Sequence, residues 1–216
     1  MDRTVLPELL DTLPPDHPDA LHNRRDLRII NAIMGNFRWF QQTLQTRRQP
    51  GEPVLEIGAG TGEMGLKLSA GIDHYAGLDL WPRPEGWPAH LAWHQYDLRE
   101  FPRYADYPVV LGNLIMHQFR DDELGALGAR LATTTRLIIA CEPARRRRSQ
   151  WVFRAIAPLL GANHVSLHDA RTSIHAGFLG DELPRLLGLD PARWEFACTT
   201  GALGYYRMIA VRRPGH

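Results

Sequence analysis

Val54-Leu-Glu-Ile-Gly-Ala-Gly-Thr-Gly62 leads from a short apolar run through a glycine-rich turn into a helical segment. A turn this tight, with a ligand against its backbone, requires residues without a Cβ atom, and the start of the helix adds free amide donors. A dinucleotide-binding fingerprint has glycine at the first, third and sixth places. Counting from Gly58, the sixth place is Glu63, and Gly62 is the fifth. The spacing therefore argues against a nicotinamide or flavin dinucleotide at this turn.

The acidic residue Glu56 stands two places before the first glycine. Its carboxylate would lie awkwardly close to a pyrophosphate, but it suits the cationic amino group of an aminoacyl ligand, directly or through water. This E-x-G-x-G-x-G pattern resembles motif I of the class I S-adenosylmethionine-dependent methyltransferases. The resemblance implies S-adenosyl-L-methionine as the cofactor and S-adenosyl-L-homocysteine as the product. It implies a cofactor loop formed by Glu56, Gly58, Ala59, Gly60 and Gly62. The alternatives are dinucleotide binding and a purely structural turn.

Short apolar runs, several bounded by Gly, Pro or Asp, recur along the chain and are typical of buried parallel strands. They are Val54 to Ile57, Tyr75 to Leu80, Leu91 to Tyr96, Val109 to Leu114 and Leu137 to Cys141. Helical segments between them are Gly62 to Ser69, Asp121 to Leu131 and Ser149 to Leu160. The proline-rich link from Leu80 to His90 predicts a loop or an abbreviated helix, and Trp194 to Thr200 with Tyr205 to Val211 predict a hairpin. The expected fold is α/β: a Rossmann-like, doubly wound, mostly parallel seven-stranded sheet that ends in an antiparallel hairpin.

The first fifty residues differ from this pattern. Their prolines, Pro7, Pro14, Pro15 and Pro18, predict an irregular arm over residues 1–20. Apolar residues recur at helical spacing from Leu21 to about Leu44, which predicts one amphipathic helix. We expect residues 1–50 to form an N-terminal arm and helical cap, and residues 51–216 to form the S-adenosylmethionine-binding domain. Small polar groups on the cap helix, Asn36 with Asn31 and Gly35, could hydrogen-bond the carboxylate of the cofactor.

Two more carboxylates follow strands where the methyltransferase family has them. Asp79 ends the second predicted strand and is expected to accept hydrogen bonds from both ribose hydroxyls. Asp97 follows the third and resembles the acid that receives the adenine amino group. The adjacent Leu80 and Leu98 are expected to sandwich the adenine ring, although a leucine beside a strand more often belongs simply to the core.

The fourth predicted strand ends in Leu111-Gly-Asn-Leu-Ile-Met-His-Gln-Phe119, which resembles motif IV of small-molecule methyltransferases. The resemblance places Asn113 and Leu114 beside the methionine part of the cofactor. Many relatives carry Asp or Ser where this chain has Gly112 or Asn113, which leaves the catalytic assignment open. The sequence lacks the Asn/Asp-Pro-Pro-aromatic motif of enzymes that methylate amino groups of nucleic acids.

Two histidines are the candidate catalytic residues. His117 follows the fourth strand closely, so we expect it near the transferred methyl, where imidazole could take the proton of a hydroxyl acceptor. Alternatively, His117 only shapes the pocket or caps the next helix. His175 forms a polar group with Arg171 and Ser173, in a segment predicted to be a loop that lines the acceptor pocket.

The spacing of His164 and His168, four residues apart with Asp169 adjacent, would suit a metal ion on a helix. Val165 and Leu167 alternate between them, so we interpret the segment as a strand or extended loop. We therefore expect no metal ion in this protein.

Composition and charge exclude other classes of partner. The net charge of +1 creates no field that attracts nucleic acid or an anionic membrane, and no apolar run approaches about 18 residues. Cys141 and Cys198 lie in strand-like stretches and are expected to be reduced thiols of a cytoplasmic protein. The run from Arg145 to Arg148 is either a solvated helix start or a site for an anionic substrate or an acidic carrier protein.

The function that these observations predict is methyl transfer from S-adenosylmethionine to a small molecule by in-line displacement. A phenolic or polyketide-like hydroxyl is the favoured acceptor. Two alternatives stay open. One is a catalytically silent protein that binds S-adenosylmethionine as a scaffold or regulator, which the missing motif IV acid supports. The other is an RNA methyltransferase, supported only by the arginine run.

Overall fold

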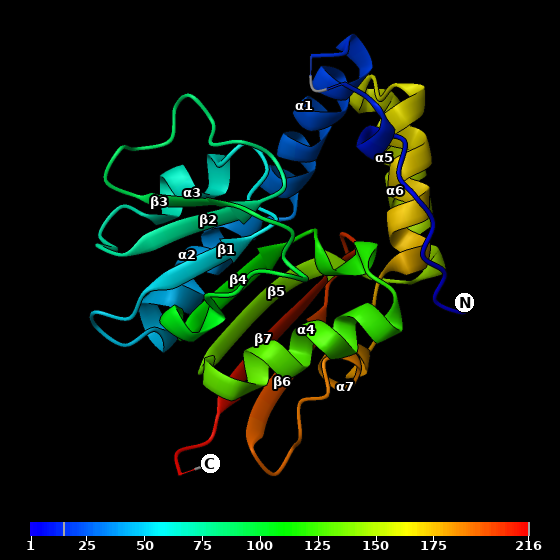
Figure 1. Cartoon of the computed structure of the whole chain (residues 1–216). Helices are drawn as coiled ribbons and strands as arrows, with labels where there is room; N and C mark the ends of the chain where they lie inside the picture. Colours follow the sequence, from blue (N-terminus) through cyan, green and yellow to red (C-terminus); the bar gives the residue numbers. More distant parts are fainter. Residues whose placement is uncertain (15, 216) are drawn as a thin grey trace.

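The centre of the molecule is a seven-stranded sheet in the order β3-β2-β1-β4-β5-β7-β6 (Figure 1). The computed structural model describes residues 1–14 and 16–215; Pro15 and His216 lie outside the described residues. The strands are β1 (Val54–Ile57), β2 (Tyr75–Asp79), β3 (Ala92–Gln95), β4 (Val109–Asn113), β5 (Leu137–Pro143), β6 (Trp194–Thr200) and β7 (Tyr205–Arg212). The first five pair in parallel, whereas β7 pairs antiparallel with both β5 and β6. The predicted fold class is confirmed, including the hairpin.

Burial explains why the strands were visible in the sequence. All residues of β1 and β5 are buried, and so are all residues of β4 except Asn113. A parallel strand covered on both faces consists of a continuous apolar run. The edge strand β6 instead alternates between more and less exposed positions, as expected for a strand with one covered face.

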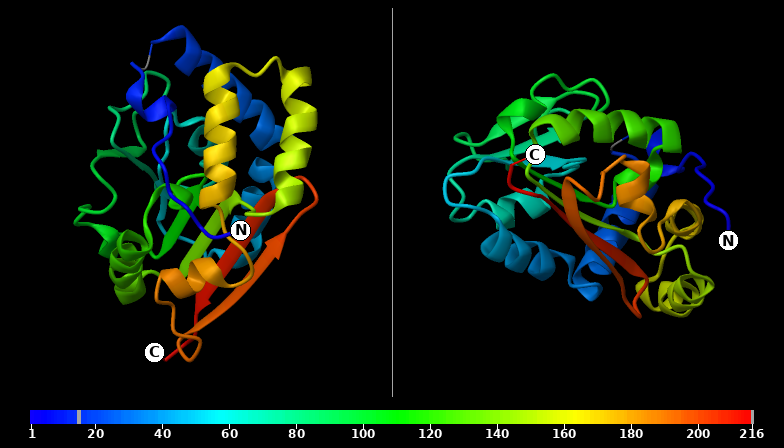
Figure 2. Two further views of the ribbon diagram at one scale, coloured as in Figure 1. Left: turned by 90° about the vertical axis from the view of Figure 1, so that its right-hand side faces the viewer. Right: turned by 90° about the horizontal axis from the view of Figure 1, so that it is seen from below.

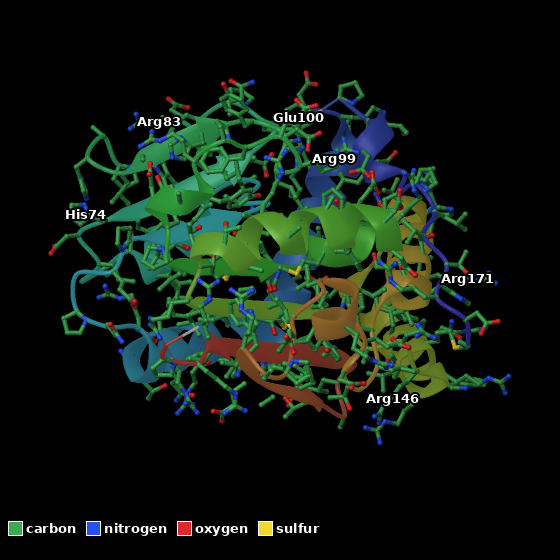
Figure 3. The ribbon with its side chains drawn as sticks, turned by 60° about the horizontal axis from the view of Figure 1, so that its bottom comes forward. His74, Arg83, Arg99, Glu100, Arg146 and Arg171 are labelled. Atoms are coloured by element: carbon green, nitrogen blue, oxygen red, sulfur yellow. The ribbon has the colours of Figure 1, made fainter. Side chains whose placement is uncertain are left out.

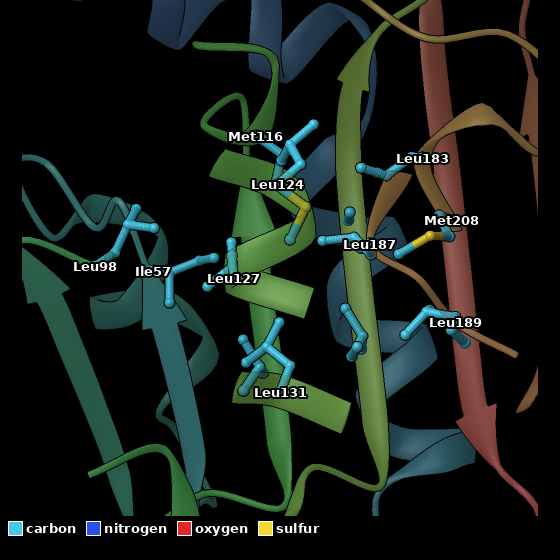
Figure 4. Packing of buried hydrophobic residues seen from close by; sticks show 14 of the residues in the cluster. Ile57, Leu98, Met116, Leu124, Leu127, Leu131, Leu183, Leu187, Leu189 and Met208 are labelled. Carbon is cyan, nitrogen blue, oxygen red and sulfur yellow. The ribbon is translucent and has the colours of Figure 1, made fainter. Parts of the chain in front are cut away.

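Helices cover both faces of the sheet. On one face lie α2 (Asn36–Arg47) and α3 (Glu63–Leu68); on the other lie α4 (Asp121–Thr134), α7 (Glu182–Leu186) and the short 3-10 helix η2 (Tyr104–Asp106). Figure 4 shows Leu124, Leu127 and Leu131 of α4 in the cluster between this helix and the sheet. Of the two alternatives for the link from Leu80 to His90, the structure has the loop, and Trp87 of this loop is buried in the core of the α2 face.

A third group of helices stands beyond the carboxyl ends of the parallel strands. It consists of α1 (Pro18–Ile33), α5 (Arg147–Leu160) and α6 (His164–Ala176). The short 3-10 helices η1 (Leu10–Thr12) and η3 (Met116–Gln118) belong to the same group. The arm that precedes α1 runs along α6 (Figure 2). The amides of Leu9 and Leu10 donate to the carboxylate of Asp169 at 2.7 and 3.1 Å, and the amide of Thr4 donates to the carbonyl of His175. The arm is therefore packed against the body of the molecule.

Two helical predictions were wrong. The helix predicted from Leu21 to Leu44 is divided into α1 and α2 at Gly35, whose φ of 64° lies in the left-handed region that favours glycine. The segment after His164, interpreted as extended, is the helix α6. The side chain of Asn163 caps that helix by accepting a hydrogen bond from the amide of Ser166 at 2.9 Å.

The two cysteines are free thiols, with Cys141 buried in β5 and Cys198 partly exposed in β6. Within residues 1–14 and 16–215, no helix has both the length and the apolar character needed to cross a membrane.

Candidate functional site

A cleft opens at the carboxyl ends of β1 and β4, where the sequence order of the sheet reverses. Ligands of open α/β sheets bind at such a switch point. Its volume is about 710 Å³, within the range of roughly 300–1,000 Å³ typical of small-molecule sites. Residues of the glycine loop and the strand ends form one side of the cleft, and α1, α6 and the arm form the other. The arm and α1 therefore cover, together with α6, the edge of the sheet where the predicted cofactor residues gather, whereas α2, the rest of the predicted cap, packs on a face of the sheet.

The glycine loop needs its glycines for two different reasons. Gly58, Gly60 and Gly62 all have positive φ, at 64°, 54° and 73°. A Cβ atom on Gly58 would come within 2.5 Å of Ile115, and one on Gly62 would come within 2.7 Å of Trp87. A Cβ atom on Gly60 would meet nothing within 4 Å, since this exposed glycine faces the cleft. Gly60 thus leaves room for a ligand, whereas Gly62 does not line the cleft and packs against the core behind it.

Glu56 is a buried carboxylate that lines the cleft and is 2% exposed. Burial, with the nearby Asp79 charge, raises its pKa to about 8, although a hydrogen bond from the Tyr75 hydroxyl at 2.8 Å opposes this rise. A cationic group bound in the cleft would stabilise the ionised form of Glu56. The contact with Tyr75 was missed in the sequence, because it joins two strands nineteen residues apart.

Asp79 connects the glycine loop to the next strand. Its carboxylate accepts hydrogen bonds from the amide of Gly60 at 2.7 Å and from the amide of Trp81 at 2.9 Å. Asp79 lines the cleft together with Leu80, which is 65% exposed. The carboxylate thus stands at the end of β2, beside the loop, where the predicted ribose contact would require it.

Asp97 also lines the cleft, and Arg99 holds its carboxylate in place. The guanidinium of Arg99 donates to Asp97 at 2.6 Å and to Glu123 at 2.7 Å, and the hydrogen bonds from Arg99 hold the pKa of Asp97 below its usual range. Leu98 lines the cleft as well, but it is 7% exposed and packs in the core cluster. Leu98 is therefore a core residue that also lines the cleft, and its contact with the adenine ring stays a prediction.

Three asparagines tie the cap to the end of β4. The amide nitrogen of Asn36 donates to Asn31 at 2.8 Å and to Asn113 at 3.1 Å, and that of Asn113 donates to Asn31 at 3.0 Å. Asn31 and Asn113 line the cleft, whereas Asn36 is fully buried behind them and does not. The structure therefore does not bring Asn36 to the predicted ligand site. Leu114, next to Asn113, lines the cleft with a positive φ of 57°, a conformation that is strained for leucine.

His117 lies between two carboxylates in a buried network. Its Nδ1 donates to Glu142 at 2.7 Å and its Nε2 donates to Glu8 of the arm at 3.3 Å. Burial alone would lower the pKa of His117, but the two carboxylates outweigh burial and raise the pKa to about 9. The hydroxyl of Ser173 also donates to Glu8. Both ring nitrogens are thus occupied, and the imidazole is held protonated near neutral pH.

Glu142 and Glu8 were not recognised in the sequence, although both shape the site. The carboxylate of Glu142 accepts hydrogen bonds from the amides of Ile115 at 3.2 Å and Met116 at 2.9 Å, which begin η3. Glu142 could have been found from the sequence, because it stands with Pro143 at the end of β5, where site residues gather. Glu8 is 109 residues from His117 and gave no such signal.

The second candidate base, His175, does not reach the cleft. It belongs to the last turn of α6, where its Nε2 lies 2.8 Å from the amide nitrogen of Gln150, and it is absent from the cleft lining of the described chain. Ser173 lines the cleft, whereas Arg171 is exposed and lies at the periphery in Figure 3. Only Ser173 of the predicted polar group therefore faces the acceptor space.

The arginine run divides into one buried and three exposed residues. Arg145 is 6% exposed and pairs with Glu182 at 2.5 Å. Arg146, Arg147 and Arg148 are exposed at the start of α5, and Figure 3 shows Arg146 at the outer surface. In the described part of the chain none of the four lines the cleft.

The spacing of His164 and His168 would suit a metal ion on a helix. These residues do lie one turn apart on α6, contrary to the extended interpretation, and Nδ1 of His168 is 3.2 Å from Asp169. No group of three or more potential metal-ligating side chains is found among residues 1–14 and 16–215.

Comparisons with known proteins agree with this fold. No protein-family profile and no curated protein match the sequence. Among solved structures, the plantazolicin methyltransferase BpumL in complex with SAH has a TM-score of 0.71 at 13% identity, covering 94% of this chain and 93% of that one. The N-methyltransferase NodS from Bradyrhizobium japonicum with S-adenosyl-L-homocysteine gives 0.53 at 14% identity, covering 81% and 84%. Magnesium protoporphyrin IX methyltransferase from Synechocystis with bound SAH gives 0.56 at 17%, covering 88% and 86%. The chain therefore has the fold of the class I methyltransferases.

Proposed function

We propose that this protein transfers the methyl group of S-adenosyl-L-methionine to a small-molecule acceptor bound under the N-terminal cap. The observation that carries the proposal is the arrangement of the glycine loop, where Gly60 leaves an open approach beside the carboxylates of Glu56 and Asp79. Structural neighbours with the same fold were solved with S-adenosylhomocysteine, which supports this cofactor.

The residues of the cleft fit this cofactor by charge and shape. Glu56 offers a buried carboxylate to an ammonium group, and Asp79 offers one to two hydroxyls. We assign the adenine ring to the space beside Leu80, Asp97 and Leu98, and the methionine part to Asn113 and Leu114. When bound, the cofactor supplies a sulfonium-activated methyl group. The chain itself orients the two reactants and excludes water through the cover formed by the arm, α1 and α6.

For the acceptor, a hydroxyl of phenolic or polyketide-like type stays our first proposal. A hydroxyl must lose its proton as the methyl arrives, and His117 is the imidazole that lines the cleft. The structure specifies a condition for that role. Glu8 must leave Nε2 of His117 before this nitrogen can accept a proton, so acceptor binding would have to displace the arm.

Other predictions concern partners and location. We keep a cytoplasmic location as a proposal. An anionic substrate or carrier protein at the arginine run is less favoured, because Arg145 is already paired with Glu182 and the exposed arginines do not line the cleft.

The experiment that tests the proposal measures binding and turnover separately. Calorimetry with S-adenosylhomocysteine should show saturable binding to one site. Incubation of the full chain with labelled S-adenosylmethionine and a library of phenols and amines should then yield S-adenosylhomocysteine above the blank. Binding without turnover would favour the silent scaffold. Tight RNA binding that weakens steeply between two salt concentrations would favour the RNA methyltransferase, and absence of any cofactor binding would refute the proposal.

A further inference from the structure

The acceptor side of the cleft is lined by four carboxylates that come from three separate segments. Glu8 and Asp11 belong to the arm, Asp26 to α1 and Asp169 to α6. The cations close to this wall already have partners. His117 is held by Glu142 and Glu8, and Arg28 pairs with Glu63. His22 lies 3.6 Å from Asp26, and His168 lies 3.2 Å from Asp169. Carboxylates therefore outnumber arginines along this wall.

Within this wall, α1 and α6 are joined by two reciprocal hydrogen bonds. The amide nitrogen of Asn23 donates to Asp169 at 3.1 Å, and the hydroxyl of Ser166 donates to Asp26 at 2.7 Å. The paired residues are three apart on each helix, so they share one face of it. All four line the cleft. The two helices are thus held together by polar contacts at the point where they roof the acceptor space.

These contacts leave two acceptor atoms without a donor. Oδ1 of Asn23 and Oδ1 of Asp26 have no hydrogen-bond partner within the described part of the chain, although both residues are only 2% exposed. Rotating the amide of Asn23 does not help, because its oxygen would then face the carboxylate of Asp169. Buried polar groups in proteins are normally paired. Two unpaired acceptors that line one cleft indicate a place for a ligand that donates hydrogen bonds.

The other carboxylates of the wall favour a ligand with a positive charge. Oxygens of Asp169 are occupied by the amides of Leu9 and Leu10 and by Asn23, so this residue fixes the arm and the wall. Asp11 is exposed at the edge of the wall, and burial together with the charges of Glu8 and Asp169 raises its pKa to about 6. Partial burial is the larger cause of this rise, and the contribution of Glu8 and Asp169 reflects a negative potential around Asp11. A cation bound there would relieve that potential.

Apolar side chains complete the same side of the cleft, namely Leu27, Ile30, Val152, Phe153 and Ile174. They suit a hydrocarbon or aromatic body next to the polar wall. Because two acceptors are free and one of them belongs to the carboxylate of Asp26, a group with several N–H donors and a positive charge satisfies both features at once.

We propose that the acceptor substrate is a small molecule with a cationic nitrogen group, an ammonium, amidinium or guanidinium, which docks on Asn23 and Asp26 while its apolar body faces α5 and α6. This inference rests on the proposed function and specifies its substrate class. The cationic group is a recognition element, and the methylated atom need not be that nitrogen.

The test uses three probes with the same phenol ring and different charge: tyramine, tyrosol and 4-hydroxyphenylacetate. Each is titrated calorimetrically into the full chain saturated with S-adenosylhomocysteine. We expect tyramine to bind at least tenfold more tightly than tyrosol, and the anionic probe to bind least. The affinity for tyramine should fall with added salt, whereas that for tyrosol should not.

The matched variants are Asp26→Asn and Asp73→Asn. Asparagine at position 26 keeps an oxygen for the Ser166 hydroxyl and removes the charge, so tyramine should lose at least tenfold in affinity while S-adenosylhomocysteine binds normally. Asp73, which is exposed and does not line this cleft, should show no change. Equal binding of tyramine and tyrosol to the unaltered chain, or a preference that persists in Asp26→Asn, would overturn the inference. Failure of the unaltered chain to bind S-adenosylhomocysteine would instead count against the proposed function. If Asp26→Asn does not fold, the salt dependence of tyramine binding to the unaltered chain tests the inference.

Discussion

Replacement of His117 by glutamine tests whether this residue is a protonated structural link or a free base. The imidazolium donates to Glu142 and Glu8, and together they raise its pKa from an ordinary 6.5 to about 9. A group whose pKa is raised by folding contributes stability that is complete below pH 6.5 and is lost as the pH rises through 9. The side chain is 3% exposed, so solvent screens these contacts little.

The magnitude follows from the size of the pKa rise. One pKa unit corresponds to about 1.4 kcal/mol, so a rise of two to three units corresponds to roughly 3 kcal/mol of unfolding free energy. Glutamine can still donate one hydrogen bond, but it leaves one buried carboxylate without its charged partner. We therefore expect His117→Gln to be destabilised by about 3 kcal/mol near pH 6 and by much less at pH 10.

The assay is urea unfolding at a series of pH values between 6 and 10, followed by circular dichroism. The unaltered chain should lose stability between pH 6.5 and 9, and His117→Gln should lack this loss. His175→Gln is the matched control, since His175 contacts Gln150 and has no ion pair among the described residues. If the pH dependence of stability persisted unchanged in His117→Gln, the protonated contact of His117 with Glu142 and Glu8 would be refuted. A rate profile with an imidazole limb near pH 6.5 would show that His117 is released from Glu8 during turnover.

Three further predictions concern the cleft. Asp79→Ala should weaken binding of S-adenosylhomocysteine by about 1–3 kcal/mol in calorimetry, because charge-assisted hydrogen bonds are lost together with the support of the Gly60 amide; unchanged affinity would remove Asp79 from the cofactor site. Gly60→Val should abolish that binding, whereas Gly71→Val, with a similar positive φ in an exposed turn, should only destabilise the fold; binding retained by a folded Gly60→Val would contradict our placement of the cofactor. Glu8→Gln should move the pH range of stability loss downward, since one of the two carboxylates that raise the pKa of His117 is removed; urea unfolding at the same pH series checks this, and an unmoved range would show that Glu8 does not contact His117 in solution.

The sheet and the cofactor half of the site could be predicted because their signals are local. Strands β1, β4 and β5 of the central sheet are buried along nearly all of their length, and the predicted cofactor residues lie at a strand end or within a few residues of one. Asp79 ends β2, Asn113 ends β4, and Gly60 lies three residues after β1. Parallel strands bring such positions to one edge whatever the rest of the chain does. The periodicity of the sequence was therefore sufficient for these residues.

The helical cap was predicted less well because its signals were ambiguous. Gly35 within an amphipathic pattern is compatible with a continuous helix at a modest cost, and only its left-handed backbone shows the break. In α6, buried Val165 and half-exposed Leu167 alternate over a stretch too short to separate the periods of a strand and a helix. The cap at Asn163 was the local sign that the segment is helical.

The acceptor half of the cleft depends on contacts that no local pattern contains. Glu8 meets His117 across 109 residues, and Asn23 meets Asp169 across 146. Such pairs form only once α1, α6 and the arm have packed over the sheet. This explains why His117 looked like a free base in the sequence and is instead held between two carboxylates. If the acceptor is cationic, as we propose, its binding at the wall that contains Glu8 would compete with the imidazolium for this carboxylate, and the arm would then couple substrate recognition to the state of His117.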